Sequence, residues 1–386
     1  MKKIFLILDG MADRKQLVLD NKTPLEFADL KNLDKLFSSA LSGCVQTIPD
    51  GEELGSAVAN LNLMGFKTKD IYKGRAVIEA AGAEIPIDEN SLYIRCNFVT
   101  LKGERYEDCV IDSYSAHEID TQDSLPLTER LNTELFGGDF ELLNTGAFRN
   151  VLRCKNKTDL LGKLNFMPPH DIIGKRVGDY LDSSEISEKY YGFMKDSYRL
   201  LSQNNDTKAN AIWFWGVSCS PDLKYGNRNK THILAETILM KGIANLMGAN
   251  KTVTSEENGF IQFLEDKKKN AIQAVKTDND FIYVHIQAPD DLSHELLIKE
   301  KADALSLIDQ YFLEGFLEGI KDEDYALVVA SDHYTFSDDG SHGGEPAPFI
   351  MYKNNDLKQN KFNGFTEQNC RDSNLKVLAS QLHNMI

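Results

Sequence analysis

Short apolar runs alternate along the chain with segments whose apolar residues recur at helical spacing. The apolar runs are Ile4–Leu8, Ala211–Trp215, Phe281–Ile286 and Tyr325–Ala330. The helical spacing is found over Pro24–Ser38, Ile233–Met247, Ser255–Lys269 and Ile298–Gly319. Short runs rich in Ile, Val, Phe and Tyr are typical of parallel strands that are buried on both faces. Strands that alternate with helices predict an α/β sheet, and ligand sites in such sheets lie beyond the carboxyl ends of the strands.

The middle of the chain has a different pattern. Strand-like stretches with short turns between them cover Ser91–Leu101, Tyr106–Tyr114 and Phe140–Cys154, and a polar helix is expected from about Ser184 to Gln203. We interpret residues 92–204 as an inserted α+β lobe that acts as a lid over the substrate. Residues 1–91 and 205–386 are then the core, with its strands resuming near Ala209.

Composition and charge narrow the choice of partner. The 386 residues are 42% hydrophobic and 26% charged, as in ordinary globular proteins, and the formal net charge is −16. Such a surface repels nucleic acid and anionic lipid, so neither is an expected partner. A small phosphorylated substrate would need a site with its own metal ions or arginines. The oligomeric state is left open.

Two further features bear on where the protein works. The opening sequence MKKIFLILDG resembles the start of a signal peptide, but its apolar run ends at Asp9 and is too short. We therefore expect a cytoplasmic protein. The six cysteines are widely spaced without a C-x-x-C pair, so we expect reduced thiols, with a structural zinc site as the weaker alternative.

Acids and histidines with the character of metal ligands follow the apolar runs. They are Asp9, Asp290 with His294, Asp332 with His333, and His342. Asp290 and His294 are four residues apart, which places both on one face of a helix. Ser56 lies in a glycine turn before a helical segment. Each piece alone also fits a turn or a helix cap, so it is their combination and order that indicate a two-metal site with a serine nucleophile.

Competing nucleotide-binding and hydrolase motifs are missing from the sequence. It contains neither a G-x-x-x-x-G-K-[ST] loop nor a G-x-G-x-x-G motif after a strand. Ser56 also lacks the G-x-S-x-G context of α/β-hydrolases.

Several longer segments carry a family resemblance that extends nearly from end to end. They are LDGMADR, KTPLEFAD, GSAVANLNLMGF, YKGRAVIEAAGA, RCNFVTL, MPPHDIIGK, AIWFWG, ILMKGIANLMGA, VHIQAPDDLSH, SDHYTF and SHGGEPAPF. On these segments the chain resembles the archaeal-type cofactor-independent (2,3-bisphosphoglycerate-independent) phosphoglycerate mutases of the alkaline phosphatase superfamily. The resemblance implies an α/β fold with a mostly parallel sheet flanked by helices, and an inserted lid lobe.

The resemblance also implies particular site residues and a reaction. One metal would be held by Asp9, Ser56, Asp332 and His333, and the other by Asp290, His294 and His342. Manganese, magnesium or zinc are the ions that the family uses. Ser56 would carry the phosphoryl group while 2-phosphoglycerate and 3-phosphoglycerate interconvert. Arg75, Arg95 and Arg149 would bind the anionic groups of the substrate.

The sequence departs from the family pattern beside the expected substrate. Ala57 stands where the family has an acid after the nucleophile, and Phe148-Arg149-Asn150 replaces Tyr-Arg-His. These changes leave three alternatives to a mutase. They are a phosphotransferase with an amino-acid-like acceptor, similar to a homoserine kinase, a metal-dependent phosphatase, and a non-catalytic sensor of a phosphorylated ligand.

Overall fold

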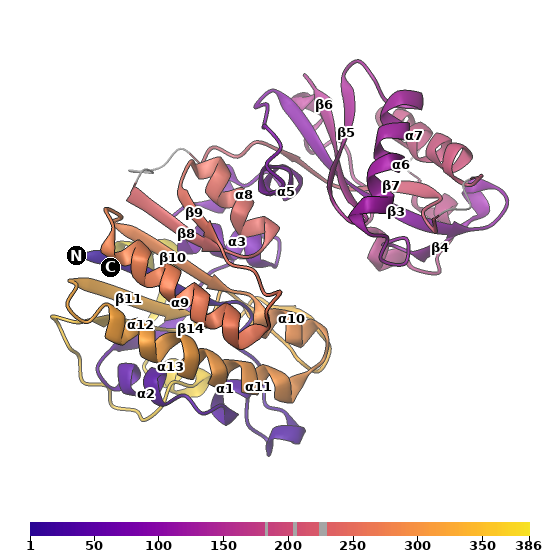
Figure 1. Ribbon diagram of the computed structural model, residues 1–386. Helices are drawn as coiled ribbons and strands as arrows, with labels where there is room; N and C mark the ends of the chain where they lie inside the picture. Colours follow the sequence, from indigo (N-terminus) through magenta and orange to yellow (C-terminus); the bar gives the residue numbers. More distant parts are fainter. Residues whose placement is uncertain (182–183, 204–206, 224–229) are drawn as a thin grey trace. The chain divides into compact units, whose positions relative to one another are not determined.

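A sheet assembled from both ends of the chain is the centre of the first of two units. The computed structural model describes residues 1–181, 184–203, 207–223 and 230–386. Unit 1 contains Met1–Tyr72 and Leu223–Ile386, and unit 2 contains Lys73–Asp222. Among the described residues, unit 1 has an eight-stranded sheet in the order β15-β2-β14-β11-β1-β10-β8-β9. The strands, labelled in Figure 1 where there is room, are β1 (Lys2–Leu8), β2 (Leu41–Gln46), β8 (Thr231–Ala235), β9 (Asn250–Val253), β10 (Phe281–Ile286), β11 (Tyr325–Ala330), β14 (Ala347–Lys353) and β15 (Lys376–Leu378).

Most neighbouring strands of this sheet are parallel. Strand β1 pairs in parallel with both β10 and β11, with Ile7 opposite His285 on one side and Ala330 on the other. Strand β14 is antiparallel to β11 and to β2. The expected mostly parallel α/β fold is therefore confirmed, and the carboxyl ends of β1, β10 and β11 are at the same edge.

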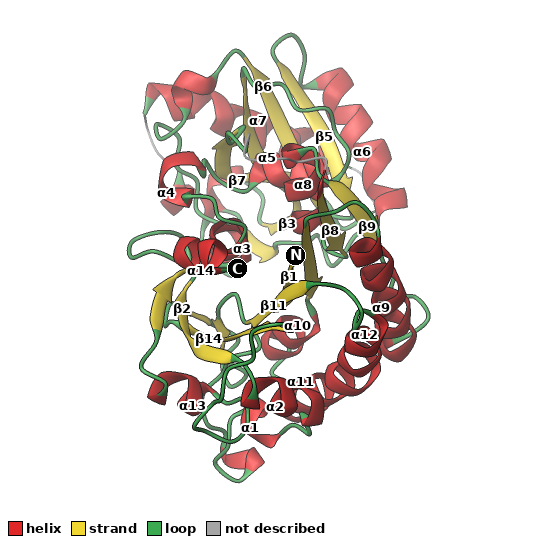
Figure 2. Ribbon diagram, turned by 90° about the vertical axis from the view of Figure 1, so that its left-hand side faces the viewer, coloured by secondary structure: helices red, strands yellow, loops and turns green. Residues whose placement is uncertain are grey.

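Helices cover both faces of the sheet in unit 1. The helical elements are η1 (Leu17–Leu19), α1 (Pro24–Phe27), α2 (Lys31–Ser38), α3 (Ser56–Leu63), α4 (Thr68–Ile71), α8 (Ile238–Met247), α9 (Phe260–Lys276), α10 (Ala288–His294), α11 (Ile298–Leu307), the π-helical η7 (Ile308–Leu313), α12 (Glu314–Gly319), α13 (Glu367–Asp372) and α14 (Ala379–Met385). Helices α9, α11 and α12 lie on one face, where Phe263 and Phe312 pack with Leu6 of β1. Helices α3 and α14 lie on the other face (Figure 2).

Unit 2 has its own sheet and its own apolar core. Its strands are β3 (Ser91–Lys102), β4 (Val110–Ser113), β5 (Phe140–Gly146), β6 (Arg149–Lys155) and β7 (Ala211–Cys219), and its helices are α5 (Ala76–Gly82), η2 (Tyr106–Asp108), α6 (Thr121–Glu134), η3 (Thr158–Leu160), η4 (Pro169–Ile172), η5 (Val177–Tyr180) and α7 (Glu185–Leu201). The long strand β3 pairs antiparallel with β4, β6 and β7. The core of this unit contains Trp213, Phe214 and Tyr190.

The structure corrects the expected return to the core near Ala209. The run Ala211–Trp215 is a strand, but as part of β7 it pairs with β3 in unit 2. Unit 2 also begins earlier than residue 92, because helix α5 packs on β3 and β7. The backbone N–H of Val77 donates to Ser218 Oγ at 2.8 Å, and the N–H of Cys219 donates to Lys73 O at 3.2 Å.

Two helical expectations also change, and one further helix is present. The segment Pro24–Ser38 is two helices, and Ile233–Met247 is the end of β8 followed by α8. Helix α6 was not expected at all.

All six cysteines are in the described residues, and each is buried and free. Within the described residues, no helix has the length and apolar character needed to cross a bilayer.

Candidate active site

The acids and histidines expected at one site lie at the shared edge of three parallel strands. Asp9 follows β1, Asp332 and His333 follow β11, and Asp290 is on α10 just beyond β10. His294 is the last residue of α10, and His342 is in the short strand β13 (His342–Gly343), which pairs with β12 (Tyr334–Thr335). Ser56 is the first residue of α3. The fold thus brings all seven residues to one edge of the unit 1 sheet.

One group of ligand-type atoms surrounds the imidazole of His333. Its Nε2 lies 3.4 Å from Asp9 Oδ1, 3.5 Å from Asp332 Oδ2 and 3.1 Å from Ser56 Oγ. Asp9, Asp332 and His333 are completely buried, and Ser56 is nearly so. This is the set Asp9, Ser56, Asp332 and His333 that the resemblance implies for one metal.

A second group surrounds the carboxylate of Asp290. Its Oδ2 lies 3.3 Å from His294 Nε2, and its Oδ1 lies 3.5 Å from His342 Nε2. The two imidazole nitrogens of His294 and His342 are 3.0 Å apart. The rings of His333 and His342 are adjacent, with centroids 4.3 Å apart, so the two groups are contiguous.

The buried charges perturb one another's protonation. Burial raises the pKa of Asp9 well above its usual value, and the nearby carboxylates of Asp332 and Asp290 raise it further. Burial also raises the pKa of Asp290, but hydrogen bonds from His294 and His342 outweigh this effect and lower it overall. The pKa of His294 is raised by its bond to Asp290, whereas burial lowers that of His333. A concentration of buried acids of this kind is stabilised by added positive charge.

The arrangement fits divalent cations. Both carboxylate oxygens of Asp9 are buried, and among the described residues their polar neighbours are the imidazoles of His285 at 3.0 Å and His333 at 3.4 Å, so an ionised Asp9 is costly unless a cation is present. One ligand atom each from Asp9, Asp332 and His333 lie within 4.8 Å of one another, and so do those from Asp290, His333 and His342. Mixed carboxylate and imidazole oxygens and nitrogens suit manganese, magnesium or zinc.

Polar residues around the site hold its acids in place. Asn60 donates from Nδ2 to Asp332 Oδ2 at 2.9 Å, and its Oδ1 accepts from the hydroxyl of Tyr283 at 2.7 Å. Thr335 donates from Oγ1 to Asp290 Oδ1 at 2.7 Å. We did not expect Asn60 or Tyr283 at the site. Asn60 is one helical turn after Ser56, and Tyr283 is in β10, the strand that precedes Asp290. Their positions relative to Ser56 and Asp290 are the sequence signal that could have placed both residues at the site.

The three arginines expected to bind substrate are in unit 2. Arg75 Nε lies 2.8 Å from Glu79, and Arg95 Nη2 lies 3.0 Å from the same carboxylate. Arg95 also stacks on Trp215, and the guanidinium of Arg149 lies 4.2 Å from the ring centroid of Phe148. Whether these arginines face the clustered acids of unit 1 stays a prediction.

Ala57 and Asn150, which depart from the family pattern, are both buried. Ala57 is buried on α3. Asn150 is buried in unit 2, where its Oδ1 accepts from Thr128 Oγ1 at 3.0 Å and from Asn144 Nδ2 at 3.1 Å. Asn150 is therefore satisfied by its own unit.

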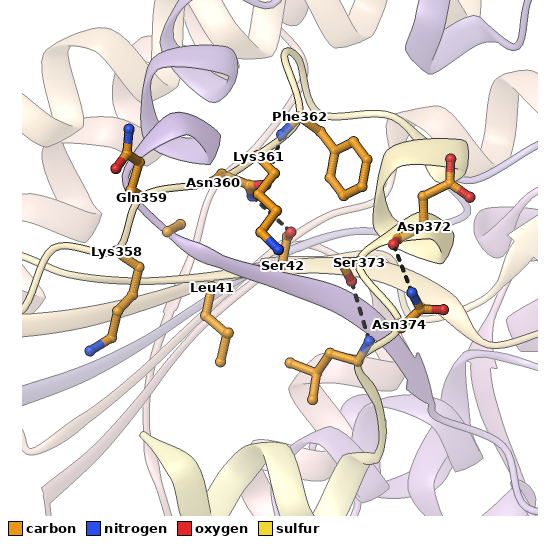
Figure 3. Close-up of a pocket in the computed structure, with 12 residues that line it drawn as sticks. Leu41, Ser42, Lys358, Gln359, Asn360, Lys361, Phe362, Asp372, Ser373 and Asn374 are labelled. Atoms are coloured by element: carbon orange, nitrogen blue, oxygen red, sulfur yellow. Dashed lines mark hydrogen bonds between the residues drawn. The ribbon is translucent and has the colours of Figure 1, made fainter.

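A cavity elsewhere in unit 1 has a different lining. It has a volume of about 510 Å³ and lies between the start of β2 and the segments 358–362 and 372–375 (Figure 3). Asn360 donates to Ser42 Oγ at 2.8 Å, and Lys361 points the same way. Its twelve lining residues include one acid, Asp372, and no histidine, so this cavity lacks the ligand types found at the strand edge.

Comparisons with known proteins agree with this architecture. The chain covers 99% of a structure entitled cofactor-independent phosphoglycerate mutase, from Thermoplasma acidophilum, with a TM-score of 0.64 and 20% identity. It covers 96% of the PH0037 protein from Pyrococcus horikoshii, with a TM-score of 0.80 and 20% identity. Both structures match over 100% of this chain. The fold thus defines an α/β protein with the architecture of a cofactor-independent phosphoglycerate mutase.

Sequence relatives make the assignment more specific. Residues 38–205 match the family model described as 2,3-bisphosphoglycerate-independent phosphoglycerate mutase. A protein of that name from Methanosarcina barkeri is 30% identical, over 98% of this chain and 97% of that protein. One named 2,3-bisphosphoglycerate-independent phosphoglycerate mutase 2, from Methanothermobacter thermautotrophicus, is 30% identical over 91% and 88%. The chain belongs to the 2,3-bisphosphoglycerate-independent phosphoglycerate mutase family and is an isomerase.

Proposed function

We propose that this protein interconverts 2-phosphoglycerate and 3-phosphoglycerate by metal-dependent phosphoryl transfer through Ser56. The observation that carries the proposal is the position of Ser56. Ser56 is the first residue of helix α3, and its Oγ lies 3.1 Å from Nε2 of His333. Both groups of carboxylates and imidazoles that could bind metal are therefore beside it. The relatives named phosphoglycerate mutases support this choice of substrate.

Two sets of residues would bind the cations, and Ser56 would carry the phosphoryl group. Asp9, Asp332 and His333, together with Ser56, would hold one divalent cation, and Asp290, His294 and His342 a second. Such cations favour loss of the serine hydroxyl proton and stabilise negative charge on the phosphoryl oxygens. Ser56 Oγ then forms a bond to phosphorus as the bond to the glycerate oxygen breaks, which gives a phosphoserine and enzyme-bound glycerate. The reverse step delivers the phosphoryl group to the other hydroxyl of glycerate.

Unit 2 is proposed to act as the lid and substrate lobe. A mutase must keep glycerate bound and exclude water while the phosphoserine exists, since water would otherwise take the phosphoryl group. Arginines bind carboxylate and phosphate with two parallel N–H donors. Arg75, Arg95 and Arg149 are the proposed residues for this role, and we expect the enzyme to work in the cytoplasm.

The test is an assay that follows both possible products. Purified protein is incubated with manganese and 3-phosphoglycerate, and 2-phosphoglycerate and free phosphate are measured together. We expect 2-phosphoglycerate to form with little free phosphate, and a chelator to abolish the reaction. Free phosphate as the main product would indicate a phosphatase. A reaction only when an amino-acid-like alcohol is added would indicate a different phosphotransferase, and no reaction with any phosphate ester would indicate a sensor.

The variant Ser56→Ala tests the nucleophile. Turnover should fall by more than about a thousandfold, because loss of a covalent nucleophile removes the chemical step. Binding of at least one cation should persist, since the carboxylates and imidazoles remain. Ser42→Ala, a serine in β2 next to the 510 Å³ cavity, is the control and should keep full activity. If Ser56→Ala retains turnover within about tenfold of the parent, Ser56 is not the nucleophile.

A further inference from the structure

Three buried ionisable side chains connect helix α9 to Asp9. The ammonium group of Lys267 forms an ion pair with Glu236 Oε2. Glu236 Oε1 lies 3.7 Å from Nδ1 of His285, and His285 Nε2 lies 3.0 Å from Asp9 Oδ2. Lys267, His285 and Asp9 are completely buried, and Glu236 is 8% exposed. We call Lys267, Glu236 and His285 the buried triad.

Lys267 occupies a position on α9 where an apolar residue would be expected. The face of α9 that packs on the sheet carries Phe263, Leu264, Ala271 and Ala274, and Lys267 lies on this same face. Removing a charged amine from water is costly, and replacing a buried ion pair by apolar groups of similar size often stabilises a protein. Packing and stability therefore do not account for a lysine at this position.

The geometry of the triad gives each member a partner. Glu236 Oε1 accepts a hydrogen bond from the backbone N–H of Gln287, while Lys267 contacts its other oxygen, so the carboxylate is fixed from two sides. His285 projects from β10 between two carboxylates, one at each ring nitrogen. It contacts Asp9 at Oδ2, and Asp9 Oδ1 faces His333. Carboxylates that bind metals are commonly held in place by a group behind them, and His285 Nε2 occupies that position for Asp9.

We propose that Lys267, Glu236 and His285 are positioning residues that fix the carboxylate of Asp9 and so set the cation affinity of the Asp9–Asp332–His333 group. The proposal rests on the metal-dependent function proposed above. Lys267 also contacts Glu236, so that this carboxylate is not left without a partner beside Asp9 and Asp332. The second group, around Asp290, has no direct contact with the triad among the interactions described. Its one link among them is Gln287, whose backbone N–H donates to Glu236 and whose Nε2 donates to Asp290 Oδ2 at 3.2 Å. Its affinity should therefore change much less.

Calorimetric titration of the metal-free protein with Mn²⁺ tests the proposal, because binding is read without turnover. The variants are His285→Gln, Glu236→Gln and Lys267→Met. One of two binding events should weaken by about 10- to 100-fold, as expected for the loss of a group that orients a metal ligand. The other event should stay within about threefold of the parent. Lys268→Met, which replaces the next lysine of α9, is the matched control and should bind both ions normally, since Lys268 bonds to Tyr311 O instead.

The double variant Lys267→Met/Glu236→Gln separates positioning from a purely structural ion pair. Removing both charges should restore the melting temperature of the metal-free protein, because neither is left buried without a partner. The affinity loss should remain. If the double variant regains parental affinity, or if all single variants bind both ions like the parent, the proposal is wrong. If Lys267→Met does not fold, the double variant and His285→Gln give the same decision.

The result can be distinguished from failure of the proposed function. Asp332→Asn removes a proposed ligand directly and should eliminate one binding event. A parent protein that binds no Mn²⁺, and that is unaffected by Asp332→Asn, would overturn the metal-dependent function itself. A parent that binds two ions with an affinity insensitive to the triad would overturn only the positioning role.

Discussion

Glu367 is a fully buried carboxylate in α13 at some distance along the chain from the residues it stabilises. It accepts a hydrogen bond from the backbone N–H of Asp13 at 3.2 Å and another from Thr23 Oγ1 at 2.8 Å. These bonds fix the loop after β1 and the start of α1. Burial raises the pKa of Glu367 to about 7 from an ordinary 4.5, against the lowering effect of these bonds, and the charge of Glu26 contributes to the rise.

The raised pKa predicts a pH-dependent stability. Because the pKa is higher in the folded protein, the stabilising contribution is complete below about pH 4.5 and is lost as the pH rises through about 7. The free energy of unfolding of the parent, relative to Glu367→Gln, should therefore fall between pH 5 and pH 8 by on the order of 3 kcal/mol. Urea denaturation with chelator present measures it. Glu318→Gln, at an exposed site of α12, should show no such trend, and a pH-independent difference for Glu367→Gln would contradict the prediction.

At the scale of residues, the sequence predicts ligand types better than the groups that support them. Asp9, Asp290 and Asp332 follow apolar runs, and the fold places all three at one edge. Glu236 also follows a strand, β8, but the pattern over Ile233–Met247 predicts a helix there, so this acid does not stand out in the sequence. Lys267 is the first of three consecutive lysines, and nothing local marks it as the buried one, because its partner Glu236 is distant in sequence. Pairing of buried charges depends on which elements pack together, and no local pattern encodes it.

Among the elements, the turn after β1 allows the backbone at Gly10 to lie very close to Asp290 and Thr335. Gly10 has a φ of +59°, and its backbone N–H donates to Asp332 Oδ1 at 3.1 Å. A Cβ at this position would lie 2.5 Å from Thr335 Oγ1 and 2.8 Å from Asp290 Oδ1. Only glycine therefore allows the end of β1 to lie against α10 with Asp290 in its present position.

The variant Gly10→Ala should displace Asp290 and Thr335. A shift of about 1 Å in a catalytic group can cost about 100-fold in rate, so we expect a loss of that order in kcat in the phosphoglycerate assay. Gly51→Ala is the matched control. It has a φ of +83° with no atom within 4 Å of its Cβ, so it shares the backbone strain without the collision. Equal losses of kcat in the two variants would show that strain alone is responsible.

Helices and strands could be predicted well where residues next to them in the sequence set their ends. The expected Phe281–Ile286 and Tyr325–Ala330 coincide with β10 and β11, because acids or turns bound these apolar runs. The helical pattern from Pro24 to Ser38 instead breaks in two. Asp309, distant in sequence, accepts hydrogen bonds from the N–H groups of Asn32 and Leu33 and fixes the start of α2. The prediction that Ala211–Trp215 joins the sheet of the core was also wrong, since the apolar pattern of a strand does not show in which sheet it pairs.

For the whole molecule, the division into two units predicts where proteases cut first. The chain crosses between units at residues 72–73 and 222–223, and connections between domains are the usual sites of limited proteolysis. We expect early fragments that end near one of these crossings, as identified by mass spectrometry. The core fragments should stay associated on native size-exclusion chromatography, because β1 pairs with β10 and β11. Early cuts inside β3 or β10 would contradict the division.

The central place of β1 has a consequence for synthesis on the ribosome. This strand is made well before both of its partners, which lie beyond residue 280. Unit 2, whose sheet and core are formed within Lys73–Asp222, can fold while the rest is still being translated. Until β10 and β11 emerge, the apolar residues Ile4–Leu8 have no sheet to join and are exposed to aggregation. The nascent chain thus depends most on protection by chaperones during the long interval between the synthesis of β1 and that of β10 and β11.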